Sequence, residues 1–182
     1  RIGIGALFGL ADWRFEALAL AAHLEHLQRV CWKSQLTVSL PRLRPCAGDF
    51  EPENPLPDRE FIQLLCALRI TFPAVGIVLS TREPAALRDL IAPLGITMMS
   101  AGSHTEPGGY TGAGKEKIHL TERGIIKEIS GASEWAPTEK QPTNATGQFN
   151  IADERSAGEV AERIRKLGYE PVWKDWDAAL TV

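Results

Sequence analysis

The side chains best suited to chemistry follow a short apolar run. Ser80, Thr81, Arg82 and Glu83 come directly after Val75–Leu79, which is rich in branched residues. A guanidinium holds a carboxylate or a phosphate through two parallel hydrogen bonds, and the two hydroxyls can add further ones. Arg82 is therefore the first candidate for binding an anionic ligand. The alternative is an ion pair between Arg82 and Glu83 on a solvated loop, which for such a pair taken alone is about as common.

A buried parallel strand would place these side chains at a ligand site. Val75–Leu79 lies between Pro73 and Pro84, is too short for a helix, and has the composition of a strand covered on both faces. Ligands of α/β proteins bind beyond the carboxyl ends of parallel strands. We therefore expect the residues that follow this strand to line a binding site.

The same alternation of strand and helix patterns runs through residues 1–112 and predicts an α/β fold with a parallel sheet. The predicted strands are Ile2–Leu10, Leu36–Leu40, Val75–Leu79 and Gly95–Ser100, and the predicted helices are Trp13–Trp32, Pro57–Phe72 and Ala85–Leu94. Asp12 is expected to cap the first helix, and Leu87, Leu90 and Ile91 are expected to face inward from the third. Four β/α units are half of an eight-stranded barrel and leave two unpaired edges, so we expect a missing part or a second copy to complete the sheet.

The helical and extended pattern weakens after this region and returns near the C-terminus. Residues 113–148 are predicted to form a polar excursion or insertion, with a short strand or helix at Gly124–Ile129. A further helix is predicted at Ser156–Leu167 and is ended by Gly168. The predicted division is residues 1–112, 113–148 and a C-terminal tail at 149–182.

Composition favours a cytoplasmic protein that binds neither nucleic acid nor membranes. The net charge is −3 and the pI is about 5.8, and no basic run is present. No stretch approaches the roughly 18 apolar residues of a membrane span, and no secretory leader is recognisable at the N-terminus. The three cysteines, Cys31, Cys46 and Cys66, have no metal-binding spacing and are expected to be reduced. The chain begins at Arg1, inside a predicted strand and without Met, so we expect a fragment.

The loop beyond Gly95–Ser100 is rich in glycines and hydroxyls that let backbone amides approach a ligand. It also holds His104, which is a candidate general base. A single loop histidine is more often only a hydrogen-bonding residue, so both interpretations stay open.

Four ordered motifs over nearly the whole chain resemble one known family. They are Thr37–Cys46 (TVSLPRLRPC), Leu79–Glu83 (LSTRE), Thr105–Tyr110 (TEPGGY) and Pro171–Asp177 (PVWKDWD). Together they closely resemble the C-terminal half of the 2-iminoacetate synthases, the tyrosine lyases of thiamine thiazole biosynthesis. This resemblance implies a radical S-adenosylmethionine enzyme with a full (β/α)8 barrel and a C-terminal tail of the biotin and thiamin synthesis associated type, of which this chain would hold the second barrel half and the tail.

The resemblance also implies the reaction and its cofactors. A [4Fe-4S] cluster and S-adenosylmethionine would generate a radical, and tyrosine would be cleaved between Cα and Cβ to 2-iminoacetate and p-cresol. The CxxxCxxC motif that binds the cluster in this family belongs to the first barrel half and is absent from this sequence. We therefore expect this chain alone to be inactive and to contain no metal ligands.

Site residues are carried over from the same motifs. On the cofactor side the resemblance implies Gly5, Leu7, Gly9, Asp12, Arg42 and Arg44, although Asp12 stands where such motifs usually have Glu. On the substrate side it implies that Arg82, with Ser80 and Thr81, holds the tyrosine carboxylate, and that Ser100, Ser103 and Thr105 complete the rim.

Two alternative functions stay open. The first is another radical S-adenosylmethionine lyase for aromatic amino acids, of the hydrogenase-maturation type; a second cysteine motif would be expected in its tail, and Tyr169–Val182 contains no cysteine. The second is a non-catalytic half-barrel that binds small molecules. The expected partners are tyrosine, the missing N-terminal barrel half and, as a candidate, the thiazole synthase.

Overall fold

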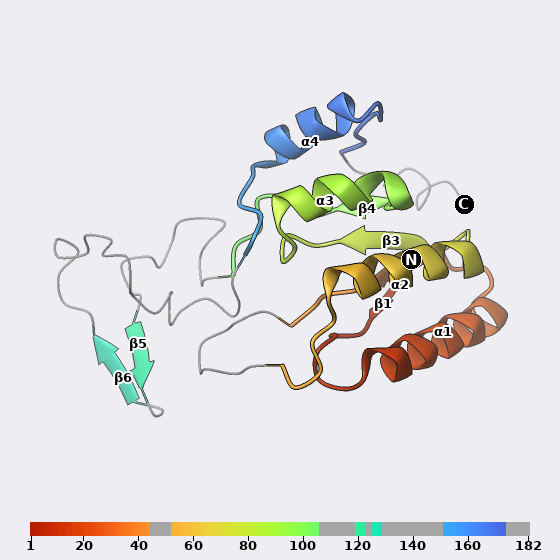
Figure 1. Cartoon of the computed structure of the whole chain (residues 1–182), viewed down its shortest axis with the longest axis horizontal. Coiled ribbons are helices and arrows are strands. Elements are labelled where there is room, and N and C mark those ends of the chain that lie inside the picture. Colours follow the sequence, from red (N-terminus) through yellow and green to blue (C-terminus); the bar gives the residue numbers. More distant parts are fainter. Residues whose placement is uncertain (44–51, 106–118, 123–124, 129–150, 174–182) are drawn as a thin grey trace. The chain divides into compact units, whose positions relative to one another are not determined.

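The computed structural model describes residues 1–43, 52–105, 119–122, 125–128 and 151–173 (Figure 1). The chain forms two compact units. Residues 1–43, 52–102 and 152–182 make up the first unit, and residues 44–51 and 103–151 make up the second. The C-terminal segment therefore belongs to the same unit as the strands and helices of residues 1–102.

Four parallel strands form the sheet of the first unit. They are β1 (Ile2–Gly5), β2 (Leu36–Ser39), β3 (Gly76–Leu79) and β4 (Met98–Met99), in the spatial order β1-β2-β3-β4. The register pairs Ile4 with Val38, Val38 with Ile77, and Leu79 with Met99. The predicted α/β fold with a parallel sheet is confirmed, and each strand is shorter than its apolar run.

Local chemistry explains where the first helix begins and where the third helix ends. Helix α1 (Trp13–Val30) starts after Asp12, whose carboxylate accepts hydrogen bonds from the first-turn amides. The predicted third helix is shorter than expected: α3 (Ala85–Ile91) passes into a 3₁₀ turn, η1 (Ala92–Leu94), because Pro93 cannot donate an amide hydrogen. Gly95 follows with a left-handed φ of 99° and ends the element.

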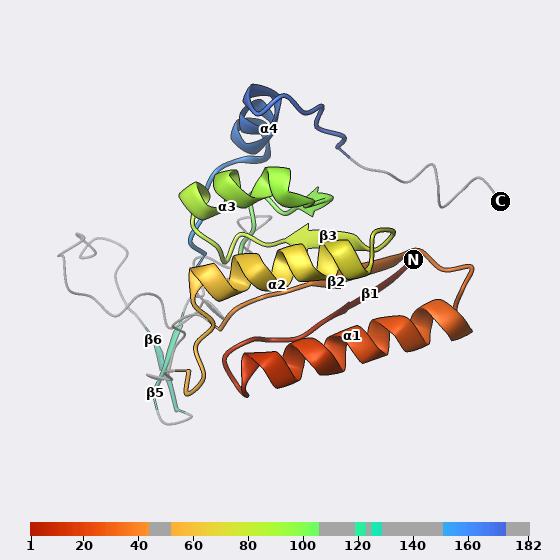
Figure 2. The same ribbon diagram turned by 45° about the vertical axis from the view of Figure 1, so that its right-hand side comes forward.

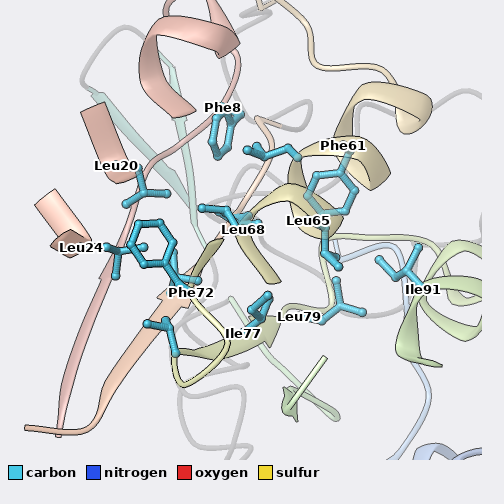
Figure 3. Packing of buried hydrophobic residues seen from close by; sticks show 14 of the residues in the cluster. Phe8, Leu20, Leu24, Phe61, Leu65, Leu68, Phe72, Ile77, Leu79 and Ile91 are labelled. Carbon is cyan, nitrogen blue, oxygen red and sulfur yellow. The ribbon is translucent and has the colours of Figure 1, made fainter. Parts of the chain in front are cut away.

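The three crossover helices α1, α2 (Asp58–Thr71) and α3 all pack on one face of the sheet (Figures 1 and 2). Figure 3 shows the core that results, with Leu20 and Leu24 of α1, Phe61, Leu65 and Leu68 of α2, and Ile91 of α3 around Ile77 and Leu79 of β3. Burying one such side chain contributes about 1.5–3 kcal/mol.

The opposite face of the sheet is open in the part of the chain that the structure describes. Gly3 and Gly5 are exposed there, and Thr37, Gly76 and Val78 are only half-buried. The expectation that β3 is covered on both faces is therefore wrong for this unit. Helices on one face and strands in sequential order are typical of barrel-type winding, whereas doubly wound sheets carry helices on both faces.

The C-terminal helix α4 (Ala157–Lys166) belongs to the first unit and is capped by Ser156. The Ser156 hydroxyl accepts from the Glu159 amide while the Glu159 carboxylate accepts from the Ser156 amide, which is a capping box. In the second unit, β5 (His119–Glu122) pairs antiparallel with β6 (Ile125–Glu128), so the segment predicted as a short strand or helix is a strand.

Candidate functional site

Backbone hydrogen bonds tie the carboxyl ends of the strands together in two neighbouring pairs. Beyond β1 and β2, Phe8 and Arg42 form an isolated parallel bridge, and the Leu43 amide donates to the Phe8 carbonyl at 2.7 Å. Beyond β3 and β4, the Ser100 amide donates to the Leu79 carbonyl at 2.9 Å. The residues that follow the strands therefore share one rim, as the sequence predicts.

Arg82 lies on this rim, half-buried between two buried neighbours, Thr81 and Glu83. Its amide donates to the Ser80 hydroxyl at 3.3 Å, which orders the start of the loop. Burial lowers the pKa of the Arg82 guanidinium, and the negative charge of Glu83 only partly opposes this. A bound carboxylate would compensate a partly desolvated cation of this kind, so the chemistry of the residue suits the predicted role, which stays a prediction.

The predicted role of Arg42 at the ligand is not supported by its contacts. Its side chain is buried, and the Nε and Nη2 groups both donate to the carboxylate of Glu83, which is itself only 1% exposed. Nη1 donates to the Leu56 carbonyl at 2.9 Å and to Asp58 Oδ1 at 2.7 Å, and the guanidinium stacks 4.6 Å from the Phe61 ring centre. Four of its five N–H groups are thereby engaged within the protein.

The electrostatics of this buried pair agree with a structural role. Burial alone would lower the pKa of Arg42, but its hydrogen bonds and charge interactions with Glu83, and then with Asp58, outweigh burial and raise it. The alternative of a solvated ion pair between Arg82 and Glu83 also fits poorly, because Glu83 is buried and bound by Arg42. Arg44, the other predicted arginine, lies outside the described residues.

The predicted cofactor-side residues in β1 and in the loop after it include residues that the fold itself requires. A Cβ on Gly5 would lie 2.5 Å from the Ser39 carbonyl oxygen, and Gly9 has a left-handed φ of 122°. The Asp12 carboxylate accepts from the amides of Arg14 and Phe15 at 3.0 and 3.2 Å. Leu7 is half-buried beside them. Their predicted contact with S-adenosylmethionine stays a prediction.

A second buried charge cluster joins the end of β4 to the C-terminal segment. Arg88 donates through Nη2 to the Ser100 carbonyl and through Nη1 to Asp153 Oδ2, and the side chains of Arg88 and Asp153 are fully buried. Arg155 also donates to both oxygens of Asp153, at 2.9 and 2.7 Å. Burial alone would raise the pKa of Asp153, but the hydrogen bonds from Arg155 and the charge of Arg88 lower it to about 2.

Sequence reasoning missed this cluster because it placed Leu90 rather than Arg88 in the core. Leu87 and Ile91 face inward as predicted, but Leu90 is 62% exposed and Arg88 takes the buried position. A signal was present, since Arg88 lies one position from Leu87 and three from Ile91, on the inward side of a short helix. A buried arginine requires an acidic partner, and Asp153 could have been sought on that ground.

The remaining predicted residues fall in the second unit or near its start. Ser103 and Thr105 are half-buried and His104 is exposed. Ser80, Thr81, Arg82 and Ser100 lie together in the first unit, whereas these three residues belong to the second unit, so the predicted place of Ser103 and Thr105 on the rim stays a prediction. A catalytic role for His104 stays open.

Comparison with known proteins decides the family. The family model of the Biotin and Thiamin Synthesis associated domain matches residues 39–170. The chain belongs to this family. The match begins at the last residue of β2, covers β3 and β4 with α2 and α3, and continues through α4, so the exits of β2, β3 and β4 and the buried charge cluster lie within the family domain.

Curated relatives of this biotin and thiamin synthesis associated chain are 2-iminoacetate synthases. The chain is 38% identical over 181 residues to the 2-iminoacetate synthase of Escherichia coli and 37% identical over 181 residues to that of Salmonella typhimurium. These matches cover 99% of this chain but only 40% of each relative. The resemblance read from the four sequence motifs is confirmed, and the chain spans two fifths of the length of these relatives.

Solved structures show the same fold. The FeFe-hydrogenase maturase HydG from Carboxydothermus hydrogenoformans superposes with a TM-score of 0.71 and 35% identity, covering 96% of this chain and 33% of that one. A second HydG structure gives a TM-score of 0.71 at 30% identity, covering 94% of this chain and 31% of that one.

The biotin and thiamin synthesis associated chain does not supply a cluster site in its described part. Among those residues, no three His, Cys, Asp or Glu side chains come together as metal ligands. The described residues suit S-adenosylmethionine better than they suit the cluster. β1 presents exposed backbone at Gly3 and Gly5 on the open face of the sheet, against which a flat adenine ring can lie. Within the described ranges, no helix is long and apolar enough to cross a membrane.

One cleft of the first unit does not include the candidate residues at the strand exits. It has a volume of about 1460 Å³ and is bounded by the open face and the amino-terminal ends of the strands, by the inner side of α4 and by the tail around Trp173. None of Ser80, Thr81, Arg82 and Ser100 lines it. The chemistry of the exits, rather than the size of this cleft, therefore marks the candidate site.

Proposed function

We propose that this chain is the C-terminal part of a radical S-adenosylmethionine lyase that cleaves tyrosine to 2-iminoacetate and p-cresol for the thiamine thiazole. The observation that carries the proposal is the 38% identity to a 2-iminoacetate synthase along 99% of the chain. The half-buried Arg82 on the strand rim supports it, because a lyase of an amino acid needs a cation for the substrate carboxylate.

The proposed architecture is the second half of a (β/α)8 barrel with a C-terminal tail. The sequential order of β1 to β4 and the placement of three helices on one face support it. Among the residues that the structure describes, β1 and β4 stand at the two ends of this sheet, and each is paired with a strand on one side. The first barrel half would pair with both edges and would bring the [4Fe-4S] cluster with its cysteine ligands.

The proposed roles follow from exposure and chemistry. Arg82 binds the tyrosine carboxylate through its forked donors, and the hydroxyls of Ser80 and Ser100 contribute from either side. Thr81 is only 3% exposed, so we assign it the positioning of Arg82 rather than ligand contact. S-adenosylmethionine, when bound, supplies the radical that starts the reaction, and the protein's task is to hold tyrosine in a fixed direction, since orientation dominates the rate of such steps.

The test is made on the full-length protein with a reconstituted and reduced cluster. Addition of S-adenosylmethionine and tyrosine should release p-cresol, measured by chromatography. Arg82→Ala should weaken tyrosine binding by about 2–5 kcal/mol, because a charged partner of the carboxylate is lost. Arg165→Ala, which removes an exposed arginine of α4, is the matched control. Unchanged tyrosine affinity in the Arg82 variant would contradict the assigned role.

A second candidate is a lyase that serves hydrogenase maturation. The structural likeness to HydG at 35% and 30% identity favours it. Genetic complementation separates the two pathways: the full-length gene should restore growth without thiamine to a bacterium that lacks its own 2-iminoacetate synthase. Failure there, together with rescue of a strain lacking its hydrogenase maturase, would favour the second candidate.

The proposed partners are tyrosine as substrate and the thiazole synthase as the protein that receives the product. A non-catalytic half-barrel would bind tyrosine without releasing p-cresol, so the same assay tests that third possibility. Co-purification of the full-length protein with thiazole synthase would test the partner.

A further inference from the structure

The segment Ala152–Arg155 connects the exits of two strands. The amides of Ala152 and Asp153 both donate to the Thr81 carbonyl, at 3.0 and 3.1 Å, which ties the segment to the loop after β3. The Arg155 carbonyl accepts from the Gly102 amide at 3.2 Å, which ties it to the loop after β4. We name this segment the clasp. Its backbone alone thus spans the part of the rim that carries Arg82 and Ser100.

The side chains of the clasp add a buried ionic centre. Asp153 binds Arg88 of α3, and the same guanidinium donates to the Ser100 carbonyl. Arg155 donates to both carboxylate oxygens of Asp153 and, through Nη1, to Asp89 at 3.0 Å. The Asp153 carboxylate therefore accepts from two arginines at once, which fixes the clasp relative to α3.

The hydrogen bonds from the clasp to the Thr81 carbonyl help to fix the orientation of the peptide plane between Thr81 and Arg82. The Thr81 carbonyl and the Arg82 amide belong to one planar peptide unit. The clasp holds the oxygen of that unit through two donors, while the Ser80 hydroxyl accepts from its N–H at 3.3 Å. With both ends of the plane held, the clasp and the Ser80 hydroxyl together fix the backbone orientation at Arg82.

We propose that Asp153 is a positioning residue for substrate binding: by anchoring the clasp to Arg88, it orients the Thr81–Arg82 peptide and thus the guanidinium that holds the tyrosine carboxylate. This inference rests on the proposed function and names what fixes its substrate-binding side chain. Loss of the anchor leaves Arg82 present but free to turn, so affinity for tyrosine falls although no contact with the ligand is removed. A displacement of about 1 Å at such a group costs up to roughly a hundredfold in rate.

The test uses Asp153→Asn in the full-length protein. The variant keeps the shape of the side chain but turns one of its two acceptors into a donor that faces arginine N–H groups. The KM for tyrosine should rise about tenfold or more while kcat falls less, and less p-cresol should form per S-adenosylmethionine cleaved. Glu162→Gln, which removes an exposed carboxylate of α4, is the matched control and should change these values less than twofold.

Hydrogen exchange gives a readout that does not depend on activity. The Arg82 amide should exchange faster in Asp153→Asn than in the wild type or in Glu162→Gln. The proposal is overturned if Asp153→Asn lowers the thermal stability but leaves both the tyrosine KM and the exchange of the Arg82 amide at control values. Absence of p-cresol from the wild-type enzyme would refute the proposed function alone, and the exchange experiment would still decide the positioning role of Asp153.

A second variant covers the case in which Asp153→Asn does not fold. Arg155→Lys leaves the pair between Asp153 and Arg88 in place but removes the forked contact with the carboxylate. It should shift the tyrosine KM in the same direction by about threefold or more and should speed exchange at Arg82. Control values in both measurements would overturn the proposal.

Discussion

Two buried arginines hold the rim together in different ways. Arg42 binds Glu83 and, in addition, Asp58 and the Leu56 carbonyl, so its guanidinium is almost fully engaged. Arg88 binds Asp153 and the Ser100 carbonyl, and its Nε has no hydrogen-bond partner among the described atoms. Burial lowers the pKa of Arg88, whereas the interactions of Arg42 raise its pKa. One cation is well compensated and the other depends on few partners.

Loop length does not account for this difference. Arg42 and Glu83 are 41 positions apart and Arg88 and Asp153 are 65 apart. The longer closure costs only about 0.4 kcal/mol more in chain entropy. The number of partners left after one is removed matters more, so the two sites should respond unequally to loss of their carboxylates.

The largest loss of stability is expected when Arg88 loses its carboxylate partner. Asp153→Ala leaves Arg88 buried with the Ser100 carbonyl as its hydrogen-bond acceptor and should lower the free energy of unfolding by about 3–5 kcal/mol. Urea unfolding of the full-length protein measures this. A loss below about 1 kcal/mol would mean that Arg88 finds other compensation.

A smaller effect is expected at the well-compensated arginine. Glu83→Ala leaves Arg42 bound to Asp58 and to the Leu56 carbonyl, so the loss should be about 2 kcal/mol. Glu25→Gln, which breaks an exposed pair with Arg29 on α1, serves as the reference and should cost at most about 0.5 kcal/mol. A larger loss of unfolding free energy in Glu83→Ala than in Asp153→Ala would contradict the proposed difference between Arg42 and Arg88.

The acid dependence of stability should sharpen the comparison further. The pKa of Asp153 is about 2 in the folded protein, against 3.8 for the ordinary group. A carboxylate with a depressed folded pKa stabilises above its unfolded pKa and loses that contribution as the pH falls through the folded value. The free energy of unfolding should therefore fall by about 2 kcal/mol between pH 4 and pH 2 because of Asp153. The Asp153→Asn variant should not show this part of the fall. Urea unfolding at a series of pH values measures this, and an equal loss of unfolding free energy in the wild type and in Asp153→Asn would contradict the prediction.

The elements of the fold could be predicted from the sequence because they depend on local patterns. Apolar spacing located α1, α2 and α3, and the cap of Asp12 was identified from its position alone. The length of β4 was overestimated, because the predicted six-residue segment Gly95–Ser100 pairs over only two residues. The likeness of the strand exits to one family was also visible in the motifs.

The buried ion pairs could not be predicted in the same way. Arg42 was assigned to the cofactor side from the family resemblance, and only the fold shows that Glu83 and Asp58 bind it. Arg88 and Asp153 are joined across the region between α3 and α4, and no local spacing relates them. Pairing of distant charges is a tertiary property, so the sequence indicated that such residues need partners but not which ones.

The side chains on the open face of the sheet would determine the free volume inside a closed barrel. In the barrel interiors of many enzymes, branched side chains fill the centre. Here the neighbouring strands place Gly3 beside Thr37, and Thr37 beside Gly76, with Gly5 beside Ser39. Residues this small cannot fill the middle of a barrel themselves. The choice of glycine, serine and threonine on β1 and β2 thus leaves room on this side of the sheet, although β3 adds the larger Val78 to the same face. In the proposed enzyme, that room is the space in which an amino acid and a nucleoside would lie together.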